Sequence, residues 1–211
     1  MGFETVRARM SLFVVFEGSD ASGKTTQASR LAERIGARLT KEPGDTPAGV
    51  RIRSLLLDHS PEGASLSPRA EALLMAADRA QHVSEVIEPT LRTGQHVVCD
   101  RYIGSSIAYQ SGGRGLPADQ IRWISEWATT GLWPDVIVLL RVPLDIVLGR
   151  LAAAGVPDRL EAEGAGFLGR VMESFDAQAA ADPERWRVVD GMGTIEEVQA
   201  RVQAAVAPFI L

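Results

Sequence analysis

The stretch Gly18-Ser19-Asp20-Ala21-Ser22-Gly23-Lys24-Thr25 decides the fold of this chain. It matches G-x-x-x-x-G-K-[ST], the pattern of a loop whose backbone N–H groups surround phosphate. The two glycines allow backbone angles that a Cβ would forbid, and the N-terminus of a following helix favours anions. In this pattern the lysine reaches the terminal phosphates of a nucleotide and the threonine binds Mg²⁺. We therefore predict that residues 18–25 bind nucleotide phosphates.

The segments on either side of this loop fit the context that the pattern requires. Residues 12–16, Leu-Phe-Val-Val-Phe, form a short apolar run, as expected of a buried parallel strand. Residues 24–35 carry apolar side chains near helical spacing. A strand, the loop and a helix therefore follow one another, which favours phosphate binding over a glycine-rich turn without a ligand.

The composition is that of a chain that can bury a core, and it limits the partners. The chain has 211 residues, of which 45% are hydrophobic, so one domain over residues 1–211 is expected. A net charge of −5 argues against a nucleic-acid or anionic-membrane partner. A single cysteine, Cys99, allows no internal disulfide and indicates a reducing compartment. No apolar run approaches the ~20 residues of a membrane span. We therefore expect a cytoplasmic protein, with residues 1–10 as a frayed tail.

Apolar strand-like runs alternate with helical patterns along the rest of the chain. Further strands are predicted at 37–40, 96–99, 136–140 and 186–189, and helices at 47–58, 67–91, 103–110, 117–130, 143–154, 167–180 and 194–207. Five strands alternating with helices predict an α/β fold of the P-loop NTPase type, with a parallel sheet flanked by helices. Ligands of such sheets bind beyond the carboxyl ends of the strands.

Three classes of phosphate-loop protein compete. Guanine-reading switches use an Asn-Lys-x-Asp segment, and this chain contains no asparagine. Motor and transporter ATPases are normally larger or visibly modular. A small-molecule kinase needs a second phosphate site that faces the loop, and Asp100-Arg101-Tyr102 follows the predicted strand at 96–99. There the carboxylate is suited to Mg²⁺ held through water, and the arginine to an accepting phosphate.

The segments around this second site resemble thymidylate kinases. Glu-Ala-Leu-Leu-Met-Ala-Ala-Asp-Arg-Ala-Gln-His at 71–82 is similar to one helix of that family. The most specific likeness is Asp-Arg-Tyr-Ile-Gly-Ser-Ser-Ile-Ala-Tyr-Gln at 100–110, which precedes Gly113-Arg114-Gly115. Thr-Lys-Glu-Pro-Gly at 40–44 resembles the family's Arg-Glu-Pro-Gly segment, and Asp-Arg-Leu-Glu at 158–161 resembles its lid. The resemblance implies transfer of the ATP γ-phosphoryl group to dTMP, which gives dTDP.

The resemblance also implies roles for the residues that match. Arg79 and Gln110 would hydrogen-bond the thymine edge, Tyr109 would crowd the 2′ position of the sugar, and Asp20 would lie near the acceptor. Arg101 and Glu42 would approach the phosphate or sugar of dTMP. The full set of expected dTMP-binding residues is Glu42, Pro43, Arg53, Met75, Arg79, Arg101, Ser105, Ser106, Tyr109 and Gln110. ATP would occupy Gly18, Ser19, Asp20, Ala21, Ser22, Gly23, Lys24 and Thr25.

The lid and the metal complete the expectations. A short mobile lid is implied at about residues 149–164. Because Ala21 stands where one subgroup carries an arginine in the phosphate loop, the lid would supply that charge, with Arg159 as the principal residue and Arg150 assisting. Mg²⁺ would bind Thr25, with Asp100 in its outer shell. The expected catalytic residues are Lys24, Arg101, Arg159, Arg150 and Asp20.

The chain departs from the family in ways that bear on affinity and rate more than on the type of reaction. Met75 stands where a phenylalanine commonly covers thymine, and a thioether covers a ring more loosely. Ala152 and Ala154 replace lid arginines of some relatives. Two alternatives therefore stay open: a related kinase for another nucleotide or a deoxynucleoside, and a nucleotide-binding regulator without catalysis. A homodimer is implied by the resemblance alone.

Overall fold

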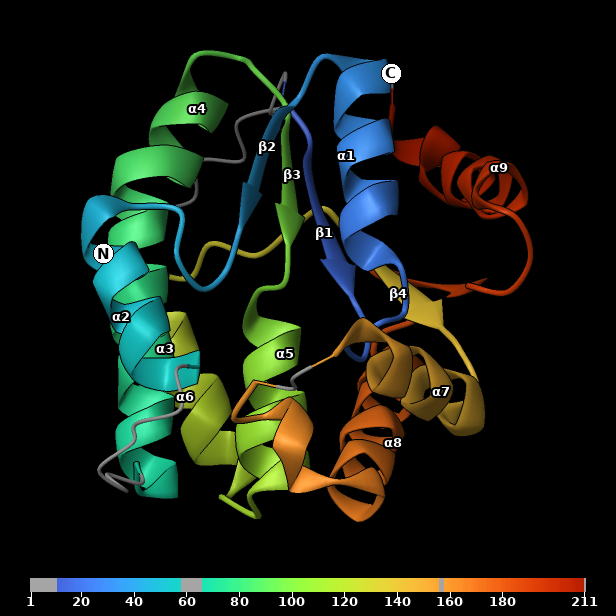
Figure 1. Cartoon of the computed structure of the whole chain (residues 1–211). Helices are drawn as coiled ribbons and strands as arrows, with labels where there is room; N and C mark the ends of the chain where they lie inside the picture. The colour runs from blue at the N-terminus through green and yellow to red at the C-terminus, as the bar shows by residue number, and fades with distance from the viewer. Residues whose placement is uncertain (1–10, 58–65, 156–157, 211) are drawn as a thin grey trace.

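A parallel sheet in the order β2-β3-β1-β4-β5 forms the centre of the molecule (Figure 1). The computed structural model describes residues 11–57, 66–155 and 158–210. The strands are β1 (Phe13–Glu17), β2 (Arg38–Lys41), β3 (Val97–Asp100), β4 (Val136–Arg141) and β5 (Trp186–Asp190). Every neighbouring pair is parallel. The predicted α/β fold with five parallel strands flanked by helices is confirmed.

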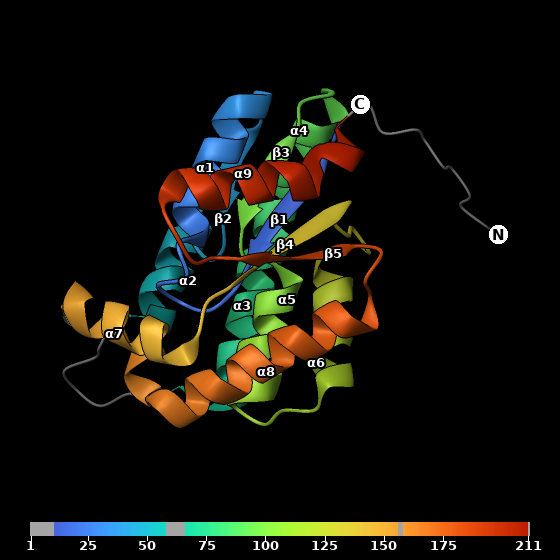
Figure 2. The same cartoon turned by 90° about the vertical axis from the view of Figure 1, so that its right-hand side faces the viewer.

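Helices cover both faces of the sheet (Figure 2). The α-helices are α1 (Lys24–Ile35), α2 (Pro47–Leu57), α3 (Pro68–His82), α4 (Glu88–Arg92), α5 (Ile103–Ser106), α6 (Ala118–Ala128), α7 (Leu144–Ala154), α8 (Ala165–Ala181) and α9 (Ile195–Val206). The 3₁₀ turns of the described residues are η3 (Glu161–Glu163) and η4 (Ala207–Phe209). Alternate residues of β1 face opposite layers, because side chains of a strand alternate. Phe13 and Val15 pack toward α3 and α8, whereas Val14 and Phe16 pack toward α1 and α9.

Two predicted helices contain π-helical segments instead of running as uniform α-helices. The helix predicted at 67–91 consists of α3, the π-helix η1 (Val83–Ile87) and α4, and it begins at Ser67, whose side chain accepts the Ala70 N–H. The helix predicted at 103–110 consists of α5 and the π-helix η2 (Ile107–Gly113). Hydrophobic spacing gives no signal for the extra residue that widens a turn, and such turns are frequent at functional sites.

Some expectations fall beyond the described residues. The tail predicted at 1–10, residue 58 of the second helix and residues 156–157 of the lid all lie outside them. In the described part of the chain, no helix combines the length and the apolar character needed to cross a membrane.

Candidate active site

The phosphate loop joins the end of β1 to the start of α1, as the motif predicts. Gly18 has a φ of 143°, and a Cβ there would lie 2.8 Å from the carbonyl oxygen of Leu140, so a larger residue does not fit. Gly23 has a φ of 90° and precedes α1. The Lys24 ammonium donates to the Ser19 carbonyl oxygen at 3.1 Å and lies 3.7 Å from an Asp20 carboxylate oxygen. The loop thus holds a buried ammonium at the N-terminus of α1, a position that favours anions.

Asp100 reaches the loop from the end of β3. Its Oδ2 accepts the Thr25 hydroxyl at 2.5 Å, which joins the two residues predicted to hold Mg²⁺. Its other oxygen, Oδ1, is buried and has no hydrogen-bond partner among the described residues. A buried carboxylate oxygen without a partner is costly unless a cation or water satisfies it. The donor set therefore fits a hydrated divalent cation.

Arg101 connects the phosphate loop with the opposite side of the site. Its NH1 donates to the Gly18 carbonyl oxygen and to Ser105 Oγ, each at 3.0 Å. Its NH2 donates to Asp20 and, at 3.2 Å, to the Tyr109 hydroxyl. Burial by itself raises the pKa of Asp20, but the charges of Arg101 and Lys24 outweigh burial and hold this pKa well below its ordinary value. The Arg101 guanidinium is therefore held between Gly18 and Asp20 of the phosphate loop and the hydroxyl groups of Ser105 and Tyr109.

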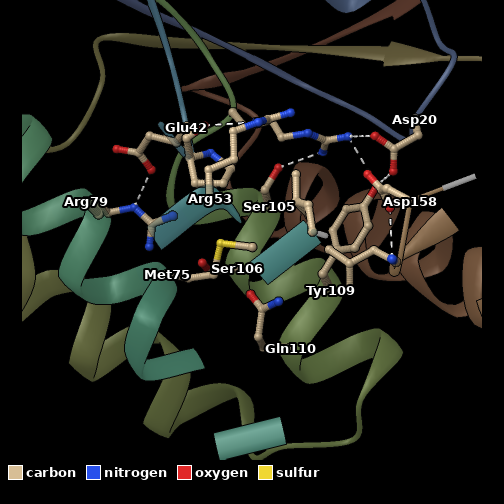
Figure 3. A pocket seen from close by; sticks show the side chains of 14 residues that line it. Asp20, Glu42, Arg53, Met75, Arg79, Ser105, Ser106, Tyr109, Gln110 and Asp158 are labelled. Atoms are coloured by element: carbon tan, nitrogen blue, oxygen red, sulfur yellow. Dashed lines mark hydrogen bonds and ion pairs between the residues drawn. The ribbon is translucent and has the colours of Figure 1, made fainter. Parts of the chain in front are cut away.

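A cavity opens between Asp20, Tyr109 and Gln110 on one side and Glu42 and Arg79 on the other (Figure 3). Arg101 also lines this cavity. The structure brings the whole set of expected dTMP-binding residues to this cavity, together with Asp20: Glu42, Pro43, Arg53, Met75, Arg79, Arg101, Ser105, Ser106, Tyr109 and Gln110. Leu57, Asp158 and Leu160 also line it, and the sequence pattern had not singled them out as ligand contacts. Asp158 and Leu160 had been quoted only as part of the lid motif.

Arg79 is held at the cavity by a buried ion pair with Glu42. The Arg79 Nε donates to Glu42 Oε2 at 2.8 Å, and its NH2 donates to the Tyr102 carbonyl oxygen at 3.0 Å. The other Glu42 oxygen lies 2.9 Å from His82 Nδ1. Both carboxylate oxygens are thus engaged by the protein. The structure gives Glu42 the role of orienting Arg79, whereas its predicted contact with dTMP stays a prediction.

The two lid arginines lie in different places. Arg150, on α7, donates from NH1 to the Ala21 carbonyl oxygen of the phosphate loop at 2.9 Å. Arg159 donates from Nε to the Leu56 carbonyl oxygen at 2.7 Å and from NH2 to Glu71 Oε2 at 2.6 Å. The structure therefore brings Arg150 to the loop and places Arg159 against α2 and α3. Glu71 is the first residue of the stretch 71–82, and the sequence assigned no role in the site to this position.

Beside the site lies Asp78, a buried carboxyl group whose pKa can be tested. Only 1% of Asp78 is exposed, and its Oδ1 accepts the Gly44 N–H at 3.0 Å. Burial, and next the Glu42 carboxylate, raise the pKa of Asp78 from 3.8 to about 6. Because the folded pKa is raised, the folded state binds more protons between these values, and stability falls as pH rises through them.

We expect Asp78→Asn to remove the loss of stability that Asp78 causes as the pH rises. The stability of the variant relative to the wild type should increase by about 1–3 kcal/mol between pH 4 and pH 7, and then stay constant. Urea unfolding of both proteins across this range measures the difference. Parallel stability curves would show that Asp78 titrates normally.

Comparison with known proteins identifies the family. The sequence profile of the family described as thymidylate kinase matches residues 16–202. The chain belongs to the thymidylate kinase family. It is 47% identical over 200 residues to the thymidylate kinase of Bifidobacterium longum strain DJO10A, which covers 92% of this chain and 96% of the relative. It is 48% identical over 204 residues to that of Cutibacterium acnes, covering 94% and 98%.

A solved structure supports the same assignment. The crystal structure of thymidylate kinase from Ehrlichia chaffeensis superposes with a TM-score of 0.76 at 29% identity, covering 93% of this chain and 98% of that one. The family resemblance inferred from residues 71–82 and 100–110 is therefore confirmed, as is the P-loop NTPase fold.

Proposed function

We propose that this chain transfers the γ-phosphoryl group of ATP to dTMP, which gives ADP and dTDP for dTTP synthesis. One observation carries the proposal: Arg101 donates both to the phosphate loop and to residues of the cavity that the family resemblance assigns to dTMP. A donor site and an acceptor site thus meet at one guanidinium. That arrangement suits a kinase more than a nucleotide-binding regulator, which needs no second site.

Phosphoryl transfer depends mainly on positioning and on neutralising charge. The loop would hold the ATP phosphates, with the Lys24 ammonium against the terminal ones. Arg101 would orient the dTMP phosphate in line with the bond that breaks. The acceptor is already an oxyanion, so no strong general base is required. Closure of the lid, which carries Arg150 and Arg159, would exclude water from the site and limit hydrolysis of ATP.

We also propose that Thr25 and Asp100 hold Mg²⁺ when ATP is bound. Asp100 Oδ1, which has no partner in the described part of the chain, and the hydroxyl of Thr25 are hard oxygen donors of the kind that this cation takes. Bound there with water, Mg²⁺ would neutralise charge on the phosphates of ATP.

Gln110 is the best-placed residue for reading the base. It is 1% exposed, and its Nε2 donates to Glu71 Oε1 at 3.0 Å. Its Oε1 has no hydrogen-bond partner within the described residues, although it is buried and lines the cavity. An N–H donor on the ligand, such as N3–H of thymine, would satisfy this oxygen. A cytosine has no such donor at that position.

We expect dTMP to be the best acceptor, dUMP weaker and UMP weakest. Loss of the thymine methyl removes about 1–3 kcal/mol of apolar contact. A 2′-hydroxyl would meet Tyr109, whose own hydroxyl donates to Asp20 at 2.6 Å and is thereby fixed. Tyr109→Ala should relax the preference for deoxyribose, whereas Tyr109→Phe, which keeps the ring, should only lower activity modestly.

Coupled ADP-release assays with dTMP, dUMP, dCMP, UMP and thymidine test both the ranking and the proposed function. Equal kcat/KM values for dTMP and UMP would rule out the thymidylate assignment. Preferred turnover of thymidine would indicate a deoxynucleoside kinase, and ATP binding without ADP release would indicate a regulator.

We further propose that the chain forms a homodimer through α3 and α6. These helices pack against each other and expose large apolar side chains: Leu73 is 57% exposed, Trp123 66% and Trp127 72%. The two tryptophans lie one turn apart on α6, and aromatic side chains are enriched in interfaces. We expect Trp127→Ser to shift sedimentation toward the monomer, whereas Val188→Ser, at an exposed position on β5, should not. A wild-type monomer at micromolar concentration would contradict the proposal.

A further inference from the structure

Glu17 is a fully buried carboxylate that the proposed mechanism has not used. It is the last residue of β1 and directly precedes the phosphate loop, and none of its surface is exposed. In the part of the chain that the structure describes, no basic side chain forms an ion pair with it. Burying an ionisable carboxyl group without a counter-ion in direct contact costs free energy, so its presence calls for a physical account.

Glu17 accepts hydrogen bonds from the start of α5. Its Oε1 accepts the backbone N–H groups of Tyr102 at 3.1 Å and Ser105 at 3.0 Å. Helix α5 has no side-chain cap of its own, so a carboxylate from β1 satisfies N–H groups that would otherwise lack partners. The fit is close, because a Cβ on Gly104 would lie 2.8 Å from this oxygen. The contact therefore fixes α5 relative to the phosphate-loop strand.

The second oxygen of Glu17 continues the chain of hydrogen bonds toward Arg101. Glu17 Oε2 accepts the Ser105 hydroxyl at 2.5 Å, and Ser105 Oγ in turn accepts from Arg101 NH1 at 3.0 Å. With its proton committed to Glu17, Ser105 Oγ presents its lone pairs to the guanidinium. Because hydrogen bonds in series polarise one another, donation to Glu17 makes Ser105 Oγ a stronger acceptor for the guanidinium.

We propose that Glu17 is a positioning residue, which orients the Arg101 guanidinium between the two nucleotide sites through the hydroxyl of Ser105. This inference rests on the proposed function, because it assigns Arg101 to the accepting phosphate. It gives a role to this fully buried carboxyl group: burial raises the pKa of Glu17 to about 7, and the Ser105 hydrogen bond and the Arg101 charge oppose this rise.

The test compares Glu17→Gln, Ser105→Ala and the double variant with Val202→Ala. Gln keeps the size of the side chain, but its amide nitrogen donates where Oε2 accepted. Val202 is fully buried on α9, on the other side of the sheet, and its variant reports the effect of lost core packing alone. Steady-state kinetics, titration of dTMP and ATP binding, and thermal unfolding are measured for each protein.

We expect Glu17→Gln to lower kcat by about 10- to 100-fold, since misplacement of a positioning group by about 1 Å costs that much. The affinity for ATP should change less than twofold. The double variant should be no slower than the slower single variant, because both substitutions interrupt the same relay, the chain of hydrogen bonds from Glu17 through Ser105 to Arg101. A crystal structure of Glu17→Gln should show the Arg101 guanidinium displaced from Ser105 Oγ.

Three results would overturn the inference: a Glu17→Gln protein with wild-type kcat, additive losses in the double variant, or losses in kcat that match those of Val202→Ala at equal loss of stability. If Glu17→Gln does not fold, Ser105→Ala alone decides, and wild-type kcat in that variant refutes the relay. A wild-type protein without dTMP kinase activity would refute the proposed function instead. The position of Arg101 in the crystal structures still tests the relay in that case.

Discussion

Replacing Lys24 with alanine is expected to abolish phosphoryl transfer, with a loss in kcat of at least about 10³-fold. The ammonium lies on the phosphate loop, 3.1 Å from the Ser19 carbonyl oxygen, where the terminal phosphates of ATP would bind. Burial, and next the Arg101 charge, lower the pKa of Lys24, while Asp20, Asp100 and Glu17 oppose them. These carboxylates favour a charged lysine, and alanine supplies no charge to replace it.

The fold should survive this substitution, because Lys24 contributes charge to the loop and no apolar packing to the core. Circular dichroism and thermal unfolding measure the fold, and a coupled assay of ADP release measures kcat. Lys41→Ala provides the matched control, since Lys41 is the other lysine of the chain and its side chain is exposed at the end of β2. Near-wild-type ADP release by Lys24→Ala would show that the loop is not the donor site.

The second large effect is expected at Arg150. The sequence favoured Arg159 as the principal lid arginine, but in the structure it is Arg150 that contacts the phosphate loop, through the Ala21 carbonyl oxygen. We expect Arg150→Ala to lower kcat by about 10³-fold, the scale on which an arginine stabilises the charge of a transferring phosphoryl group. The KM for dTMP should change little, since the interaction strengthens in the transition state.

Arg159→Ala is expected to act differently. Arg159 forms an ion pair with Glu71, and Glu71 also accepts a hydrogen bond from the Gln110 side chain. The substitution would therefore remove a positive charge from a buried carboxylate that contacts Gln110, the residue proposed to bind the base. The KM for dTMP should therefore rise more than kcat falls. Steady-state kinetics on both variants separate the two roles. A nearly silent Arg150→Ala together with a crippled Arg159→Ala would restore the ranking that the sequence favoured.

Local patterns in the sequence determined the frame of this protein. The spacing of Gly18, Gly23 and Lys24 specifies a turn and a helix start whose geometry depends on neighbours in the chain. The apolar runs of β1, β3 and β4 read as strands buried on both faces, as they are. Order along the chain then placed the loop and Asp100-Arg101 at one edge of a parallel sheet. Shared motifs, by resemblance, named the residues that line the cavity.

Only the tertiary structure decided which polar partners these residues take. Arg79 pairs with Glu42, and Glu42 with His82, across about 40 positions of sequence. Arg159 could have met the loop or Glu71, since both offer acceptors, and the packing of its segment against α2 and α3 selected Glu71. Hydrophobic periodicity sets which face of a helix is buried, but it does not set the angle and depth at which helices meet. The angle and depth of helix packing decide whether two polar groups come within hydrogen-bonding distance. The partners of Arg79, Glu42 and Arg159 are therefore set only in the assembled fold.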